Sequence, residues 1–228
     1  MSLKIWHISD THTFHGHLKV PKDVDMVIFS GDCSNPREFY KNEQEVRNFI
    51  TWFATLPIKY KIFVAGNHDV SIEAGYITED NFKQTGIIYL ENESVNIGGF
   101  KIWGSPVTPS FGLGWAFNKR RDKLHELWSS IPDDTDIIIS HGPPKGILDL
   151  SYNMKNDLEM CGCEALRKRC LKIQPKLVCF GHIHSMEGIV NAGYLKQADH
   201  DTIYSNGSVV LDGKFDKGAV TNGNIFEI

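Results

Sequence analysis

The sequence predicts an α/β protein in which buried strands lie between helices. Two observations favour this class. Short apolar runs rich in β-branched residues alternate with segments of helical periodicity. One closely spaced pair of runs also predicts a hairpin, so we expect a mixed sheet. Because no repeat, low-complexity tract or linker-like segment interrupts the pattern, we expect a single domain over residues 1–228.

Six apolar runs have the length and composition of β-strands, at residues 3–8, 26–29, 60–65, 100–103, 136–139 and 177–180. Their apolar character predicts strands that are covered on both faces. Residues 88–103 differ, because two strand-like runs follow each other closely around Gly98-Gly99. This spacing predicts a β-hairpin.

Three segments are predicted to be helices, at residues 43–56, 119–130 and 163–171. The first carries apolar residues at three- and four-residue spacing, as on one helix face: Val46, Phe49, Ile50 and Phe53. Each segment stops before a proline, which cannot continue a helix: Pro57, Pro132 and Pro175.

Composition narrows the functional class. The 228 residues include 24 Lys and Arg and 28 Asp and Glu, a net charge of −4. This mild acidity argues against strong non-specific binding of nucleic acid. No apolar run approaches the ~18 residues that span a bilayer, and the first ten residues lack the pattern of a signal peptide. Five cysteines, an odd number, are typical of reduced thiols, so we expect a cytoplasmic protein without membrane association.

Polar residues directly follow five of the strand-like runs. These segments are Ser9-Asp10-Thr11-His12, Ser30-Gly31-Asp32, Gly66-Asn67-His68-Asp69, Ser140-His141-Gly142 and Gly181-His182-Ile183-His184. In an open α/β sheet the carboxyl ends of the strands share one edge, where ligands bind. We therefore expect these side chains to converge on one crevice.

Carboxylates and imidazoles together are typical ligands of divalent first-row metals. Asp10 with His12, and His182 with His184, are two residues apart, so each pair would point to one side if its segment were extended. Asp32 stands alone after its strand and is a reasonable bridge between two ions. Small residues before these segments, such as Gly66, would permit close backbone approach.

Each motif also has an ordinary structural interpretation. Asp10-Thr11-His12 or His182-Ile183-His184 alone could be a polar turn, and Asp32 could cap a helix. His141 could simply pack at a strand end. All five motifs occur in one chain, each after a strand-like run, and this conjunction favours a shared metal site.

The order of these motifs resembles the calcineurin-like metallophosphoesterase superfamily, whose pattern is D-x-H, G-D, G-N-H-[DE], a lone H and G-H-x-H. The resemblance implies a four-layer α/β/β/α sandwich of two mixed sheets flanked by helices, with a dinuclear site. It implies one metal bound by Asp10, His12, Asp32 and His184, and a second bound by Asp32, Asn67, His141 and His182. His68 would be a catalytic, non-ligand histidine beside the substrate, oriented by Asp69.

The expected activity is hydrolysis of a phosphoester by hydroxide held between two divalent ions. Manganese is the first expectation, with Fe, Zn, Ni or Mg as alternatives. His68 would stabilise developing charge or protonate the leaving group. Asn67 and His68 would also contact the substrate, which we expect to be a small phosphoester.

Further runs are similar to a branch of small metallophosphodiesterases active on cyclic nucleotides. They include Gly104-Ser105-Pro106, Gly114-Trp115-Ala116-Phe117-Asn118 and Ser140-His141-Gly142-Pro143-Pro144. Trp115 or Phe117 could stack on a nucleobase, although the sequence favours the simpler role of a ring that covers a sheet. The Asp-Arg-Gly that protein phosphatases carry after the bridging Asp is absent. Arg37 could reach the site in its place or be a solvated surface residue.

The sequence favours a phosphodiesterase acting on a small substrate, with cyclic nucleotides one possibility. A phosphomonoesterase acting on nucleotides or small phosphates is the main alternative, and a nuclease is another. A non-catalytic interaction module with the same fold is disfavoured because every expected ligand type is present. Oligomeric state and native metal are not predicted.

Overall fold

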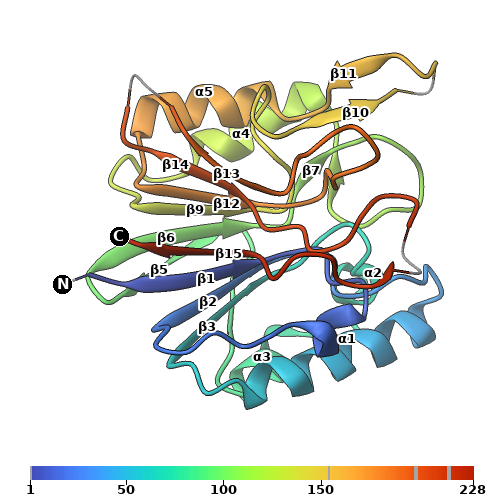
Figure 1. Cartoon of the computed structure of the whole chain (residues 1–228), viewed down its shortest axis with the longest axis vertical. Coiled ribbons are helices and arrows are strands. Elements are labelled where there is room, and N and C mark those ends of the chain that lie inside the picture. Colours follow the sequence, from blue (N-terminus) through green and yellow to red (C-terminus); the bar gives the residue numbers. More distant parts are fainter. Residues whose placement is uncertain (1, 154, 198–199, 215–216) are drawn as a thin grey trace.

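A computed structural model describes residues 2–153, 155–197, 200–214 and 217–228. Two mixed sheets pack face to face, with helices on both outer surfaces (Figure 1). This is the four-layer α/β/β/α sandwich that the motif resemblance implied.

The first sheet has the order β15-β1-β2-β3-β4, with β1 to β4 parallel and β15 antiparallel to β1. Its strands are Lys4–Ile8 (β1), Met26–Ser30 (β2), Tyr60–Val64 (β3), Ile88–Tyr89 (β4) and Asn224–Glu227 (β15). The predicted runs near residues 3, 26 and 60 are therefore its three central strands.

The second sheet has the order β13-β14-β12-β9-β6-β5, parallel from β14 to β6 and antiparallel at both edges. Its strands are Glu93–Ile97 (β5), Phe100–Ser105 (β6), Ile137–Ser140 (β9), Leu177–Phe180 (β12), Gly193–Lys196 (β13) and Ile203–Asn206 (β14). The predicted Gly98-Gly99 turn joins β5 to β6. Ile88–Tyr89 is not part of that hairpin, because it pairs with β3 in the other sheet.

Three of the described helices correspond to the predicted segments with shifted ends, and the two short helices at Val70–Glu73 and Glu79–Lys83 were not predicted. The helices are Phe39–Thr55 (α1), Val70–Glu73 (α2), Glu79–Lys83 (α3), Leu124–Ser129 (α4) and Glu164–Ile173 (α5), with 3₁₀ turns at Phe14–His17 (η1) and Arg121–Lys123 (η2). The segment predicted as one helix over 119–130 is wrong at its start, because Asn118–Lys119 forms a short strand, β8, with Thr108–Pro109, β7. A further short hairpin pairs Leu150–Tyr152 (β10) with Leu158–Met160 (β11).

Strand alternation builds three apolar layers. On β9, Ile137 and Ile139 face the space between the sheets, whereas Ile138 faces α4 and α5. On β2, Ile28 likewise faces inward and Phe29 packs toward α1. Each central strand is therefore covered on both sides, which explains its continuous apolar sequence.

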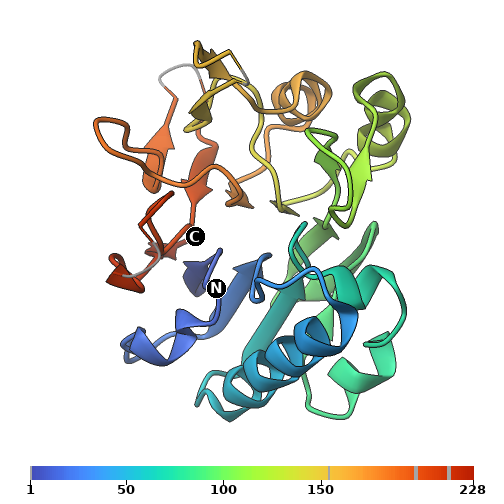
Figure 2. The same cartoon turned by 90° about the vertical axis from the view of Figure 1, so that its right-hand side faces the viewer.

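The carboxyl ends of the parallel strands meet at one side of the molecule, at the right of Figure 1 and facing the viewer in Figure 2. The chain termini lie toward the opposite side (Figure 1). Across the described residues, no helix combines the length and the apolar character that a membrane span requires.

Candidate metal centre

The expected ligands sit in sharp turns at the strand ends rather than in extended segments. Four of them have positive φ: Asp10 (52°), His12 (42°), Asp32 (61°) and His182 (67°). Non-glycine residues uncommonly adopt this region, and such outliers gather at functional sites. The extended geometry that we assumed for the Asp10/His12 and His182/His184 pairs is therefore wrong. The pairs reach the site through turns instead.

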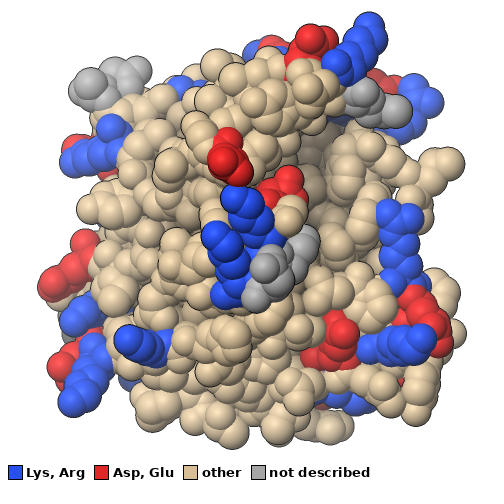
Figure 3. Space-filling view, turned by 45° about the vertical axis from the view of Figure 1, so that its right-hand side comes forward, with Lys and Arg blue, Asp and Glu red and all other residues tan. Residues whose placement is uncertain are grey.

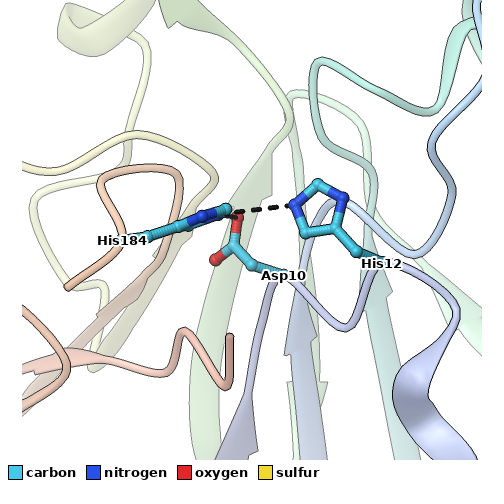
Figure 4. Close-up of side chains that lie close together, drawn as sticks. All are labelled: Asp10, His12 and His184. Carbon is cyan, nitrogen blue, oxygen red and sulfur yellow. Dashed lines mark hydrogen bonds and ion pairs between the residues drawn. The ribbon is translucent and has the colours of Figure 1, made fainter. Parts of the chain in front are cut away.

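Asp10, His12 and His184 form the first cluster (Figure 4). His184 Nε2 lies 3.1 Å from Asp10 Oδ1 and 3.4 Å from His12 Nε2. The Asp10 and His12 side chains are fully buried. Ligand atoms of all three lie within 4.8 Å of one another, so one ion could contact all of them.

Asp32, His141 and His182 form the second cluster. His141 Nε2 lies 3.2 Å from Asp32 Oδ2 and 2.9 Å from Asn67 Oδ1. Asp32 Oδ2 also lies 4.0 Å from His12 Nε2 of the first cluster. The Asp32 carboxylate therefore stands between the two groups. His182 and His184, two residues apart, belong to different clusters.

The imidazole tautomers show that both clusters fit a cation. His141 Nδ1 lies 2.8 Å from the Ser30 carbonyl, which can only accept, so Nδ1 carries the proton. Neutral His141 therefore presents the Nε2 lone pair to the Asp32 carboxylate. Two facing electron-pair donors repel unless a proton or a metal ion lies between them. Together with the carboxylate, amide and imidazole donors, this geometry fits divalent first-row ions.

Asn35 fixes the tautomer of His12. The Asn35 amide NH₂ donates to the His12 carbonyl at 3.0 Å, and its Oδ1 lies 2.8 Å from His12 Nδ1. Since the NH₂ must face the carbonyl, Oδ1 must accept from Nδ1–H. The His12 Nε2 lone pair then points into the cluster. The Asn35 backbone N–H donates to Glu45 at 2.8 Å, which ties this loop to α1.

His68 lies at the edge of both clusters. Its backbone N–H donates to Asp32 Oδ1 at 2.7 Å, and its Nδ1 donates to the Asn35 carbonyl at 3.2 Å. A ring nitrogen of His68 also lies within 4.8 Å of ligand atoms of His12 and Asp32. The Asn35 contact leaves Nε2 as the basic nitrogen of neutral His68.

Asp69 does not orient His68 as we expected. Its carboxylate accepts hydrogen bonds from the backbone N–H groups of Asp32, Cys33, Ser34 and Gly66 at 2.8–3.2 Å, and from the Ser34 hydroxyl at 2.7 Å. The Asn35 carbonyl binds the His68 ring in the position that we expected the Asp69 carboxylate to occupy. Asp69 thus holds together the turns after β2 and β3, because a buried carboxylate must be hydrogen-bonded.

Small residues permit this packing, as the sequence predicted. A Cβ at Gly66 would overlap the Asp32 carboxylate, and a Cβ at Gly181 would overlap the Asp10 carboxylate. Any larger residue at either position would push a candidate ligand out of place.

The charges of the centre are strongly coupled. Burial alone would lower the pKa of His141, but the neighbouring Asp32 outweighs it and raises the pKa to about 9. Burial opposes ionisation of Asp32 too, yet His141 and the other histidines lower its pKa well below the usual value. Burial lowers the pKa of His12 to about 4 and that of His182 to about 3. The arrangement favours ionised Asp10 and Asp32 beside neutral imidazoles at His12 and His182. Burial alone would lower the pKa of His184, but Asp10 raises it, so the carboxylates favour a proton on His141 and His184 whose place a bound cation would take.

Trp115 and Arg37 lie beside the centre rather than elsewhere on the surface. The Trp115 ring centroid is 4.3 Å from that of His68, and the Arg37 guanidinium lies 3.7 Å over the indole. The Ala116 N–H donates to the Asn67 carbonyl at 3.0 Å, which anchors the aromatic loop to the site. A pocket of about 250 Å³ is lined by Trp115, Phe111 and four of the candidate ligands, which are Asp32, Asn67, His182 and His184.

Comparison with known proteins identifies the family. The profile of calcineurin-like phosphoesterases matches residues 3–186, which include all five motifs. The chain belongs to this family. Human metallophosphoesterase domain-containing protein 1 is 34% identical over 226 residues, covering 89% of this chain and 64% of that protein. A UPF0046 protein of Caenorhabditis elegans is 34% identical over 207 residues, covering 84% of this chain and 67% of that one.

The fold is shared with solved structures. Phosphopantetheinyl hydrolase of Mycobacterium tuberculosis matches with a TM-score of 0.61 at 12% identity, over 100% of this chain and 96% of that one. The chain spans only about two thirds of the human relative. The matched family is one of phosphoesterases.

Sequence reasoning did not find Asn35 or the scaffolding role of Asp69. Asn35 follows Asp32 by three residues in Gly-Asp-Cys-Ser-Asn, a run that reads as an ordinary turn. Its contacts with His12 and His68 depend on the turns after β1 and β3, so only a three-dimensional structure reveals them.

Proposed function

We propose that this protein is a phosphodiesterase that binds two divalent cations and hydrolyses a small substrate. The observation that carries the proposal is the place of Asp32, whose Oδ2 lies 3.2 Å from His141 Nε2 and 4.0 Å from His12 Nε2. A carboxylate between two imidazole clusters is suited to bridge a pair of ions.

In this proposal Asp10, His12, Asp32 and His184 hold one cation, and Asp32, Asn67, His141 and His182 hold the other. Manganese is the first candidate, and iron, zinc, nickel and magnesium are alternatives. Two bound cations would supply Lewis acidity at the phosphoryl oxygens and a nucleophile at neutral pH. The nine-tenths or greater burial of Asp10, His12, Asp32 and His141 keeps bulk water from competing with the substrate.

His68 is proposed as the group that supports the leaving oxygen. Its Nδ1 is bound to the Asn35 carbonyl, so its Nε2 is the atom that would hold or deliver a proton. Asp69 shapes the turns around Asp32 and acts only through them. Trp115 lies against the His68 ring and would contact the part of the substrate next to the phosphate.

The test is hydrolysis of bis-p-nitrophenyl phosphate by metal-free protein to which each of the five cations is returned in turn. We expect manganese-dependent turnover that a chelator abolishes, with a stoichiometry near two cations per chain. Chelator-resistant turnover, or none with any cation, would contradict the proposal.

Two further measurements refine it. The ratio of turnover on bis-p-nitrophenyl phosphate to that on p-nitrophenyl phosphate separates a diesterase from a monoesterase. Cyclic nucleotides are the first natural diesters to try, because the finer motif resemblance points to them. His68→Ala should retain both cations and lose most turnover, since this side chain is proposed to move a proton and not to hold metal.

The proposal includes a reducing compartment such as the cytoplasm. All five cysteines are free, and Cys33, Cys163, Cys170 and Cys179 are buried. Thiols in this arrangement are typical of proteins that form no disulfide framework.

A further inference from the structure

A second, larger groove opens directly beside the candidate metal pocket. It has a volume of about 770 Å³ and extends along the β10–β11 hairpin. The groove and the metal pocket share five lining residues, which are Phe111, Ser151, His182, Ile183 and Asp212. A group esterified to a phosphate held at Asp32 would therefore have this groove as a continuous path away from the centre.

The groove carries more negative than positive side chains. Its carboxylates are Asp157 and Glu159 on the hairpin side and Asp212 at the junction with the metal pocket. The lining cations are Lys155 and Arg121. Figure 3 shows this face, where an acidic side chain adjoins a hollow in the surface and a group of basic side chains lies beside it. Away from the proposed cations at the junction, the lining carries one more negative than positive charge and gives a second anion no net attraction.

Arg121 is poorly placed to bind a second phosphate directly. Its two terminal nitrogens donate to the carbonyls of Gly162 at 3.0 Å and Cys161 at 2.9 Å. These contacts fix the guanidinium against the backbone, so gripping a phosphate would require it to leave both carbonyls. Lys155 is then the lining cation with no such backbone bond among the described contacts.

Aromatic surface supplies the rest of the lining. Phe111 is 47% exposed and Tyr152 is 49% exposed, and both line the groove. Phe111 also lies 4.9 Å, between ring centroids, from His182 of the metal centre. Flat rings among carboxylates suit an uncharged polar group or an alkylammonium group, which gains from ring and carboxylate together.

We infer that the groove binds the ester group of the substrate and selects phosphodiesters that carry a single phosphate. This inference rests on the proposed function and adds the substrate class. The favoured ester group is uncharged or cationic, whereas a second phosphate, as in an oligonucleotide chain, is rejected.

A matched pair of substrates tests the inference. The p-nitrophenyl ester of thymidine 5′-phosphate has an uncharged nucleoside, and its 3′-phosphorylated counterpart adds one phosphate and changes nothing else. We expect kcat/KM to be at least about tenfold lower for the phosphorylated counterpart, with the difference shrinking at high salt. p-Nitrophenyl phosphorylcholine, whose ester group is cationic, should be cleaved as well.

Variants then assign the effect to the groove. Asp157→Asn combined with Glu159→Gln removes two negative charges from the hairpin. It should reduce the ratio of kcat/KM between the unphosphorylated and the 3′-phosphorylated ester by about threefold per charge. Glu93→Gln combined with Glu227→Gln makes the same charge change on exposed edge-strand residues and should leave the ratio unchanged. Titration of manganese-loaded protein with thymidine 5′-phosphate and thymidine 3′,5′-bisphosphate gives a binding measurement that does not require turnover.

The outcomes distinguish the two proposals. If neither ester is hydrolysed with any cation, the proposed function fails. If both esters are hydrolysed equally, or the 3′-phosphorylated ester is preferred, the proposed phosphodiesterase function stands and the groove assignment is overturned. An unchanged ratio in the hairpin variant would also overturn the groove assignment.

Discussion

The metal centre and the groove beside it are built in opposite ways. In the centre, Asp10, His12, Asp32 and His141 are at most 2% exposed and are held by backbone and side-chain hydrogen bonds. Around the groove, Phe111 and Tyr152 are about half exposed. The difference separates two tasks. A buried frame sets the positions of the reacting groups, whereas an exposed rim can vary its side chains without disturbing the fold.

The largest effect should come from the residue that joins the two clusters. We expect Asp32→Ala to lower kcat/KM for bis-p-nitrophenyl phosphate by about 10³-fold or more, because both proposed cations lose a ligand. Metal analysis of the same sample should give fewer than two cations per chain. Near-normal activity in a folded Asp32→Ala protein would remove the bridge from the mechanism.

Next in size is the pH dependence of stability in the metal-free protein. Burial lowers the pKa of His7 to about 3, against an unfolded value near 6.5, so the unfolded chain binds more protons between these pH values. The free energy of unfolding should therefore fall as the pH decreases from 7 to 4, with His7 accounting for up to about 3 kcal/mol.

Denaturant titrations at each pH measure this slope. His7→Gln should flatten it, because the buried imidazole that resists protonation is gone. His125→Gln alters an exposed histidine and serves as the control. A slope that His7→Gln leaves unchanged would show that other buried groups account for the acid sensitivity.

Asn35 tests whether a residue that only orients a proposed ligand affects the affinity for metal. Asn35→Leu removes the acceptor that fixes the His12 tautomer and should weaken manganese binding by about 10- to 100-fold. Calorimetric titration with the metal measures this without reference to turnover. Asn48→Leu removes a comparable amide–imidazole contact, to His15 at 2.9 Å, away from the centre and should leave metal affinity unchanged.

The smallest effect on stability should come from the exposed rim of the groove, to which Phe111 and Tyr152 belong. Tyr152→Ala should change the free energy of unfolding by less than about 0.5 kcal/mol, because the side chain is half exposed. It should nevertheless raise KM for a diester several-fold. A destabilisation comparable to that of a core substitution would break the contrast between frame and rim.

The frame could be predicted from sequence because its signals are local. Apolar runs such as Leu177–Phe180 reveal buried strands, and the polar motif directly after each strand reveals the shared edge. The four layers and the grouping of His182 apart from His184 required the resemblance to a known family as well. The strands β13, β14 and β15 were missed because they are short and mix polar with apolar residues.

The rim could not be predicted in this way. Leu150–Tyr152 and Leu158–Met160 are three-residue strands with largely exposed side chains, so they lack the periodicity that marks a buried element. The contacts of Asn35 and Asp69 join turns that are distant in sequence. Asp69 illustrates the limit, because a turn residue next to His68 proved to bind the backbone of residues 32–34 and 66 instead.

The left-handed turns at Asp10, His12, Asp32 and His182 also affect how the protein takes up its ions. Each such turn disfavours the folded chain by about 1–2 kcal/mol, and the surrounding structure must compensate during folding. An arriving ion then meets donors that are already aligned, so little chain entropy is lost on binding. Ion uptake and thermal resistance should consequently rise together, with each filled position raising the melting temperature according to its occupancy.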